Sequence, residues 1–211
     1  MKHQLRWTVV LFPVLLSACS GLLPHAEPVD IYRLPAAHDA VSRADSKPAS
    51  AWQLRVNTPQ ATGMVAGKRI VVVPESNRVS VYHGARWNQA APQMLRDRMI
   101  GAFRHTPGVS AVFGDDVSLG SDFLIDGTLD AFQSEYGGHK TPTVVIRLDA
   151  MLIRGTDHQV VATRQFESRI PVGATDVPSV VEAFGKAADR LSAQVVAWAM
   201  PQMTVADTSG D

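Results

Sequence analysis

The feature that most constrains this chain is its only cysteine, Cys19, together with the eighteen residues before it. A basic start with Lys2 and Arg6 leads into an apolar run from Trp7 to Leu16, which is the order of a secretory signal. The run is too short to span a bilayer, since a transmembrane helix needs roughly 20 apolar residues. Leu16-Ser17-Ala18-Cys19 then matches a lipobox. We therefore expect a lipoprotein signal peptide over residues 1–18 that is cleaved and takes no part in the fold.

Cleavage at a lipobox leaves Cys19 as the new N-terminus, with a diacylglycerol on its sulfur and an N-palmitoyl chain on its amine. Each buried CH₂ contributes roughly 0.8 kcal/mol, so three acyl chains make a stable anchor. The next residue is Ser20, where an Asp would commonly mark retention in the inner membrane. We therefore expect a Gram-negative lipoprotein anchored at the periplasmic face of the outer membrane. The alternative is an ordinary cleaved signal followed by an unmodified cysteine.

Composition sets further limits on the mature part of the chain, which has 193 of the 211 residues. With its one cysteine acylated, the chain has no thiol for a disulfide, a thiolate metal site or a cysteine nucleophile. Stability must therefore come from packing. The chain has 20 basic and 20 acidic residues, and loss of Lys2 and Arg6 leaves 18 basic against 20 acidic. This balance predicts no nucleic-acid partner.

The segment that follows the anchor differs in composition from the rest. Residues 19–50 are rich in Pro, Ala and Ser, with one short apolar stretch at 29–34. We expect a lipid-anchored tether that contains a short strand, a folded domain over 51–200, and a disordered polar tail over 201–211. A chain that starts near Ala49 is expected to fold by itself.

Apolar periodicity predicts seven strands in the domain. Some alternate with a period of two and others are short apolar runs, and they lie at Trp52–Val56, Arg69–Val73, Arg78–Tyr82, Val109–Phe113, Phe123–Gln133, Val144–Leu152 and Val160–Ile170. We expect the last three to form an antiparallel meander. In the first of these three strands, the pattern puts Phe123, Ile125, Leu129 and Ala131 on one face.

Two segments show helical periodicity. One runs from Pro92 to Arg104, and the other starts near Ser179, where Glu182 completes a capping box, and ends at Pro201. The apolar stripe of the second helix comprises Val180, Val181, Phe184, Ala188, Leu191, Val195 and Trp198. Together the elements predict an α+β fold with a single mixed, largely antiparallel sheet, covered on one face by the two long helices.

The sequence contains no familiar catalytic or metal-binding pattern. No two histidines have helical i, i+4 spacing, and Asp115, Asp116 and Asp122 lack the spacing of a calcium loop. Asp126 and Asp130 alternate with apolar residues, which is typical of the solvent-exposed face of a sheet. The alternative is that these two carboxylates form a glycosidase pair. No nucleophile elbow or phosphate-binding loop occurs. We therefore expect no metal, no cofactor and no enzymatic activity.

Arg86 and Trp87 form the candidate partner contact of the chain. Trp and Arg are enriched at the centres of protein interfaces, so the pair is a candidate anchor for a partner. Trp87 also stands at the entry to the first predicted helix, where an apolar residue can pack against the helix and fix its direction. Packing is the interpretation that we favour for Trp87.

The order of the elements resembles that of the ABC-type transport auxiliary lipoproteins, the PqiC-like family. The resemblance rests on short stretches spread over nearly the whole mature chain: Ile31-Tyr32-Arg33-Leu34, Arg69-Ile70-Val71-Val72-Val73-Pro74, Val79-Ser80-Val81-Tyr82, Arg86-Trp87 followed by Pro92 and Leu95, Leu129-Asp130-Ala131-Phe132, Val161-Ala162-Thr163-Arg164-Gln165-Phe166, and Ala183 and Ala187 before Leu191 and Trp198.

The resemblance implies a non-enzymatic subunit of an envelope transport system that moves phospholipid or another hydrophobic solute between the two membranes. Its partners would be an MCE-domain periplasmic protein and, indirectly, an MlaE-type permease and an ABC ATPase. Only Cys19 carries over as a functional position. The alternative of a different class is an envelope lipoprotein that scaffolds or activates a cell-wall synthesis or outer-membrane assembly machine.

The lipobox generates the first testable prediction. Substitution Cys19→Ala removes the acylated sulfur, so we expect the variant to lose its acyl chains and to remain uncleaved or become soluble. Metabolic labelling with palmitate and membrane fractionation measure both effects. If the variant still sediments with outer membranes, the lipobox assignment is wrong.

Overall fold

The protein folds as one mixed sheet with two helices. The structure, a computed structural model, describes residues 28–36, 52–104 and 106–208. Within these residues eight strands form a single sheet: β1 (Asp30–Tyr32), β2 (Trp52–Val56), β3 (Arg69–Glu75), β4 (Arg78–Trp87), β5 (Val109–Gly114), β6 (Phe123–Glu135), β7 (Thr143–Arg154) and β8 (Val160–Pro171). The helices are α1 (Ala91–Arg104) and α2 (Val177–Thr208), and a short 3-10 helix covers Gly63–Ala66.

Strand β6 organises the sheet because it has neighbours along both edges. One edge pairs antiparallel with β7, which in turn pairs antiparallel with β8, so the predicted meander is confirmed. The other edge pairs in parallel with β2 near the start of β6 and with β3 near its end. The sheet continues from β2 to β5 and from β3 through β4 to β1. The α+β class and the mixed sheet are therefore as predicted, with its longest pairings antiparallel.

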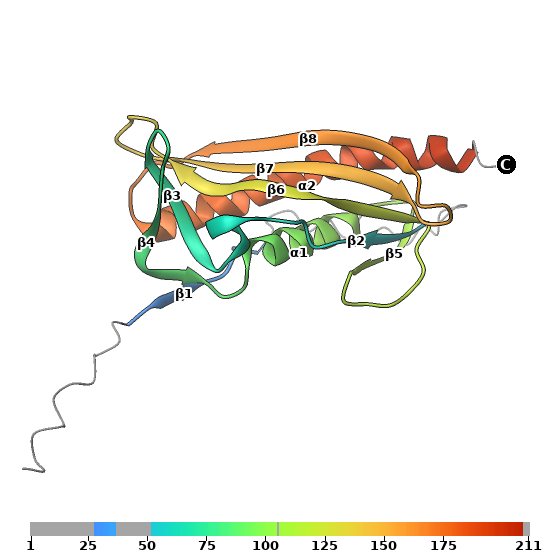
Figure 1. The fold of residues 1–211 in the computed structure, drawn as a ribbon, viewed down its shortest axis with the longest axis horizontal. Helices are drawn as coiled ribbons and strands as arrows, with labels where there is room; N and C mark the ends of the chain where they lie inside the picture. The colour runs from blue at the N-terminus through green and yellow to red at the C-terminus, as the bar shows by residue number, and fades with distance from the viewer. Residues whose placement is uncertain (1–27, 37–51, 105, 209–211) are drawn as a thin grey trace, which may run out of the picture.

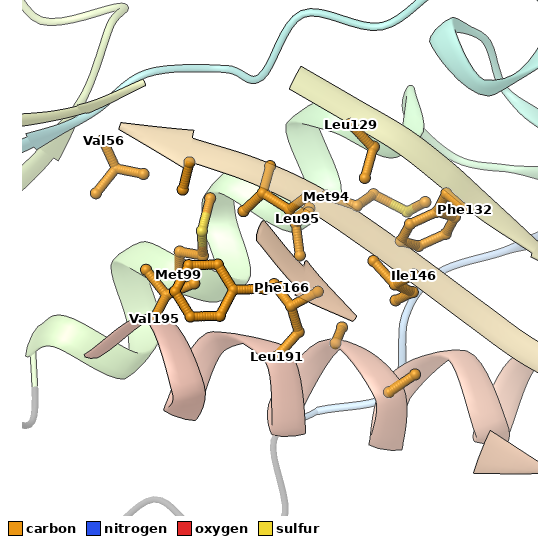
Figure 2. Packing of buried hydrophobic residues seen from close by; sticks show 14 of the residues in the cluster. Val56, Met94, Leu95, Met99, Leu129, Phe132, Ile146, Phe166, Leu191 and Val195 are labelled. Atoms are coloured by element: carbon orange, nitrogen blue, oxygen red, sulfur yellow. The ribbon is translucent and has the colours of Figure 1, made fainter. Parts of the chain in front are cut away.

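Helix α2 packs along the long strands β7 and β8, and α1 packs beside α2 against β5 and β2 (Figure 1). Their apolar stripes join the inward side chains of the sheet in one hydrophobic cluster. Every member of the stripe predicted for α2 is buried in this cluster. Figure 2 shows its middle, where Met94 and Leu95 of α1 and Leu191 and Val195 of α2 lie around side chains of the sheet.

The inward face of β6 differs from the prediction at one point. The pairing of β6 with β7 shifts register between Leu129 and Ala131, which leaves Asp130 as an extra residue. After this β-bulge the alternation is inverted, so Phe132 enters the core opposite Ile146, and Ala131 pairs with Arg147 on the other face. The prediction that Ala131 shares the face of Leu129 is therefore wrong.

The short strand predicted within residues 29–34 is present as β1, and it is part of the sheet. Strand β1 pairs in parallel with the end of β4, and the Asn88 backbone N–H donates to the Tyr32 carbonyl at 2.7 Å. Leu34 packs against the core cluster, and Pro35 lies against α2 at Gly185, where an added Cβ would approach its ring to 3.0 Å. The folded domain thus starts before residue 51, and it includes residues 28–36. The remainder of the predicted tether lies outside the described residues.

Helix α2 starts earlier than predicted, and a different residue caps it. The Asp176 carboxylate accepts the Ser179 backbone N–H at 2.9 Å and the Ser179 hydroxyl at 2.9 Å, so Asp176 is the N-cap and the predicted capping box at Ser179 is wrong. Pro178 fits in the first turn because its missing N–H has no intrahelical acceptor there. The backbone hydrogen bond from Ser179 holds the pKa of Asp176 below its usual value.

Helix α2 also passes through Pro201, where it was predicted to end. It continues to Thr208, so residues 202–208 of the predicted disordered tail are helical. An internal proline costs about 3 kcal/mol. Burial of Met203 and Ala206, which extend the apolar stripe, offsets this cost, since a fully buried Met contributes roughly 1.5–3 kcal/mol. The Arg154 guanidinium also donates to the Ala206 carbonyl at 3.4 Å.

The packing of α2 generates the second prediction. Leu191 is fully buried on the stripe, whereas Lys186 of the same helix is exposed. Leu191→Ala should lower the free energy of unfolding by roughly 2–5 kcal/mol, against less than about 0.5 kcal/mol for Lys186→Ala. Denaturant titrations of both variants measure the difference. Equal losses would contradict the face assigned to α2.

Candidate functional site

The two residues of the predicted partner contact, Arg86 and Trp87, point to opposite sides of the sheet. Trp87 is fully buried, and its ring makes edge contacts with Phe132 at 6.0 Å and with Phe184 at 5.2 Å between centroids. A partner cannot reach this side chain, so packing is its role and the interface assignment for Trp87 is wrong. Arg86, next to it on β4, points the other way and is exposed, because adjacent residues of a strand face opposite sides of the sheet. Cys19, the predicted lipidation site, lies outside the described residues.

Strand register brings Arg86 into a basic row that sequence spacing does not reveal. Ile31 of β1 pairs with Arg86 of β4, and Arg86 pairs with Arg69 of β3. Directly paired residues share a face of the sheet, so these three side chains lie side by side on the face away from the buried Trp87. We call Ile31, Arg69 and Arg86 the basic row. It lies at the end of the molecule opposite the C-terminal end of α2 (Figure 1).

The basic row has no counter-charge in contact. No described residue forms an ion pair or a hydrogen bond with the side chain of Arg69 or Arg86. The nearby cations Arg33 and Lys68 are likewise exposed and without such a bond to the described part of the chain. Two like charges directly opposite each other on adjacent strands destabilise a sheet. The pairing of β3 with β4 therefore places two arginine side chains where they repel each other.

On the long strands, the charges of this sheet face are compensated by ion pairs. Arg147 donates to Glu167 at 2.9 Å from its Nε, and Arg169 bridges Glu167 and Glu135 at 3.4 and 3.1 Å. The hydrogen bond from Arg147 holds the pKa of Glu167 below its usual value, and Glu167 raises that of Arg147. Each cation of this charge ladder contacts an acidic side chain, whereas the cations of the basic row do not.

An open cavity of about 360 Å³ lies beside the β3–β4 hairpin. Its lining is mixed, from Val73, Ser76, Asn77, Val79, Gln133, Glu135 and Gly137. Nearby, the hydroxyls of Tyr82 and Ser134 are 3.0 Å apart, and burial raises the pKa of Tyr82 to about 12. A neutral phenol does not deprotonate a serine near pH 7, so this pair is not an activated nucleophile. The cavity has no chemistry that we can assign.

Three of the carboxylates considered from the sequence have structural hydrogen bonds. Asp115 accepts from Arg96 at 2.7 Å and from the Thr58 hydroxyl at 3.0 Å. Partial burial acts to raise its pKa, but these hydrogen bonds outweigh burial and lower it. Asp122 accepts the Gln53 backbone N–H, and Asp126 accepts the Asn57 amide. Among the residues that the structure describes, no group of three or more His, Cys, Asp or Glu side chains is arranged to hold a metal.

One structural contact was not anticipated from the sequence. Arg98 of α1 pairs with Asp189 of α2 at 2.5 Å and also donates to the Pro35 carbonyl. Only a tenth of the Arg98 side chain is exposed. This cation therefore joins both helices to the N-terminal segment, and the loss of either charged partner would leave the other poorly solvated. No local motif marks the pair, because its members are far apart in the sequence.

Comparisons with known proteins agree with this architecture. The chain is similar to protein XCC0632 from Xanthomonas campestris, whose crystal structure is described under the family model DUF330. The two are 31% identical, with a TM-score of 0.75 over 85% of this chain and 99% of that one. An uncharacterized protein of solved structure is 19% identical with a TM-score of 0.61, over 80% of this chain and 97% of that one. The second likeness shows the fold alone.

A more distant likeness is to the hypothetical protein CT253 from Chlamydia trachomatis, at 6% identity and a TM-score of 0.50, over 74% of this chain and 98% of that one. It again shows only the fold. The comparison with curated proteins finds no match. Within the described part of the chain, no helix has both the length and the hydropathy to cross a membrane.

The family comparison covers most of the chain. The model of the family described as "ABC-type transport auxiliary lipoprotein component" matches residues 32–196, which span the region from the end of β1 to the middle of α2. It thus includes α1, the first part of α2, the long meander and the strands that carry Arg69 and Arg86. The chain belongs to the family of ABC-type transport auxiliary lipoprotein components.

Proposed function

We propose that this protein is a non-enzymatic lipoprotein at the periplasmic face of the outer membrane, where it docks the carrier of an intermembrane transport system. The carrier would be an MCE-domain periplasmic protein, connected to an MlaE-type permease and an ABC ATPase in the inner membrane. The cargo would be a phospholipid or another hydrophobic solute. The observation that carries the proposal is the family match over residues 32–196.

The chemistry of the described residues supports a binding role. Asp115, Asp122 and Asp126 are occupied by structural hydrogen bonds, and Tyr82 leaves Ser134 without a base. No nucleophile with an adjacent base can be assembled from these groups. A tethered domain of this kind acts through the surfaces that it presents.

The distribution of aromatic residues supports assigning the hydrophobic cargo to the carrier. Trp87, Phe132 and Phe184 pack against one another in the core, and Trp52 and Phe123 form a second buried pair. The cavity beside the β3–β4 hairpin has a mixed lining that contains no aromatic side chain. Sites for hydrophobic ligands are typically concave and lined by apolar and aromatic side chains. We therefore assign to this subunit the docking step and not the enclosure of lipid.

A membrane anchor makes docking of this kind effective at low protein concentrations. Tethering converts the meeting of two proteins into an event within a confined volume, which raises the effective concentration of the partner site. A modest contact surface then suffices to keep the carrier at the outer membrane.

A second candidate function is that of an envelope lipoprotein that scaffolds or activates cell-wall synthesis or outer-membrane assembly. The specific observation in its favour is the uncompensated basic row on an otherwise polar sheet face. Such a surface fits an acidic partner protein as well as it fits a role in transport. The identity of the captured partner separates the two functions.

The third prediction is that the mature lipoprotein, purified by affinity after gentle solubilisation, recovers an MCE-domain protein. Phospholipid is expected in the complex and not in this subunit alone, because Trp87, Phe132 and Phe184 are buried in the core and the cavity beside the β3–β4 hairpin has no aromatic side chain in its lining. Mass spectrometry of the proteins and lipids measures both results.

The Cys19→Ala chain is the matched control for this experiment. If it folds and is exported, it should still bind the MCE-domain protein in solution but should not carry that protein into the outer-membrane fraction. Recovery of a cell-wall synthase or an outer-membrane assembly component in place of the MCE-domain protein would favour the second function. Turnover of an ester or glycan substrate by the purified protein would contradict both.

A further inference from the structure

The basic row combines an exposed apolar side chain with two cations. Ile31 is 59% exposed although it lies in a strand, and its neighbour Val29 is 48% exposed. Arg86 pairs with Ile31 on one side and with Arg69 on the other. Exposed aliphatic groups beside Arg and Lys are the combination found where proteins lie on an anionic membrane surface, with the aliphatic group entering the headgroup region.

Most of the exposed charges near the row are positive, and the one carboxylate beside it in β1 is Asp30. Arg33 and Lys68 add two exposed cations at the same end of the sheet. Asp30 is next to Ile31 but alternates to the opposite side of β1, where it pairs with Ala85. Asp130 lies on β6, and its charge acts on Arg147. The mature chain as a whole is slightly acidic, so this end of the sheet is a local concentration of positive charge.

The row is also close to the proposed anchor along the chain. Nine residues, from Cys19 to Glu27, separate the acylated end from the first described residue, Pro28. Whatever their conformation, nine residues span at most about 30 Å. Because residues 28–36 are docked on β4 and α2, the anchored end stays within the reach of these nine residues from this end of the sheet. The basic row can therefore reach the lipid surface.

We propose that the sheet end formed by β1, β4 and the start of β3 is a membrane-docking surface. Arg69 and Arg86, with Arg33 near them, bind the phosphates of anionic phospholipids, and Ile31 and Val29 enter the headgroup layer. The inference rests on the lipid anchor of the proposed function and deepens it, since docking would fix the orientation in which the other surfaces meet the carrier. The repulsion between Arg69 and Arg86 is relieved when phosphates lie between them.

The test uses the lipidated mature protein in vesicles. Its one native cysteine is acylated, so a fluorophore can be placed on a single introduced thiol, either Val29→Cys on the docking surface or Gln194→Cys on the exposed side of α2. The vesicles contain lipids with a nitroxide on the headgroup, which quenches a nearby fluorophore. One set is phosphatidylethanolamine with phosphatidylglycerol at about three to one, and the other is phosphatidylcholine alone.

We expect strong quenching of the label at residue 29 in the anionic vesicles, weaker quenching in the zwitterionic vesicles, and little at residue 194 in either. Raising the salt to about 1 M, where the Debye length falls to about 3 Å, should remove the difference between the vesicles. Arg69→Glu combined with Arg86→Glu should lower the ratio of docked to undocked protein at least about tenfold. The matched control, Lys186→Glu with Arg190→Glu on the exposed side of α2, changes the net charge equally and should leave quenching unchanged.

A second variant keeps the test decisive if charge reversal impairs folding. Arg69→Gln with Arg86→Gln removes the repulsion between the strands, so it should melt no lower than the parent while it loses docking in the anionic vesicles. Equal quenching at residue 29 in both vesicle types, unaffected by either variant, would overturn the proposal. Flotation with the vesicles reports the anchor separately, because loss of flotation contradicts the lipid anchor, whereas loss of the anionic preference alone contradicts only the docking surface.

Discussion

The structure depends on the inward packing of Trp87. Its ring contacts Phe132 of β6 and Phe184 of α2, and these two rings stack with centroids 4.8 Å apart. The three rings thereby join the end of β4 to the centre of the sheet and to the covering helix. Large aromatic side chains dominate core energetics, and here the packing tolerates an indole N–H with no hydrogen-bond partner among the described residues. With Trp87 fixed inward, the alternation of the strand places Arg86 outward.

The same packing determines where the N-terminal segment can dock. Tyr32 pairs with Trp87 in register, and the backbone beyond Trp87 donates to the Tyr32 carbonyl. Pro35 then lies where α2 has a glycine, and Arg98 donates to its carbonyl. A segment that would otherwise be a long linker is thus reduced to a short one. The packing that forms the core of the domain therefore also holds residues 28–36, which follow the proposed membrane anchor in the sequence.

The sequence predicts well what depends on local periodicity. The stripe of α2 follows from spacing within one element, and the meander of β6 to β8 follows from the alternation of three consecutive strands. The errors have specific causes. The bulge at Asp130 inverts the faces of β6 after a correctly predicted start, and the burial of Met203 and Ala206 outweighs Pro201. The basic row needs register between three strands, and the Arg98–Asp189 pair needs helix packing, so neither can be derived from spacing along the chain.

The central claim is that residues 28–36 belong to the folded domain and hold its basic end near the anchor. Amide hydrogen exchange of the mature protein, followed by mass spectrometry, tests it most directly. We expect the peptide that covers residues 28–36 to be protected, along with the Asn88 amide that donates to Tyr32. Exchange of residues 28–36 at the rate of an unstructured peptide, while α2 remains protected, would contradict the account.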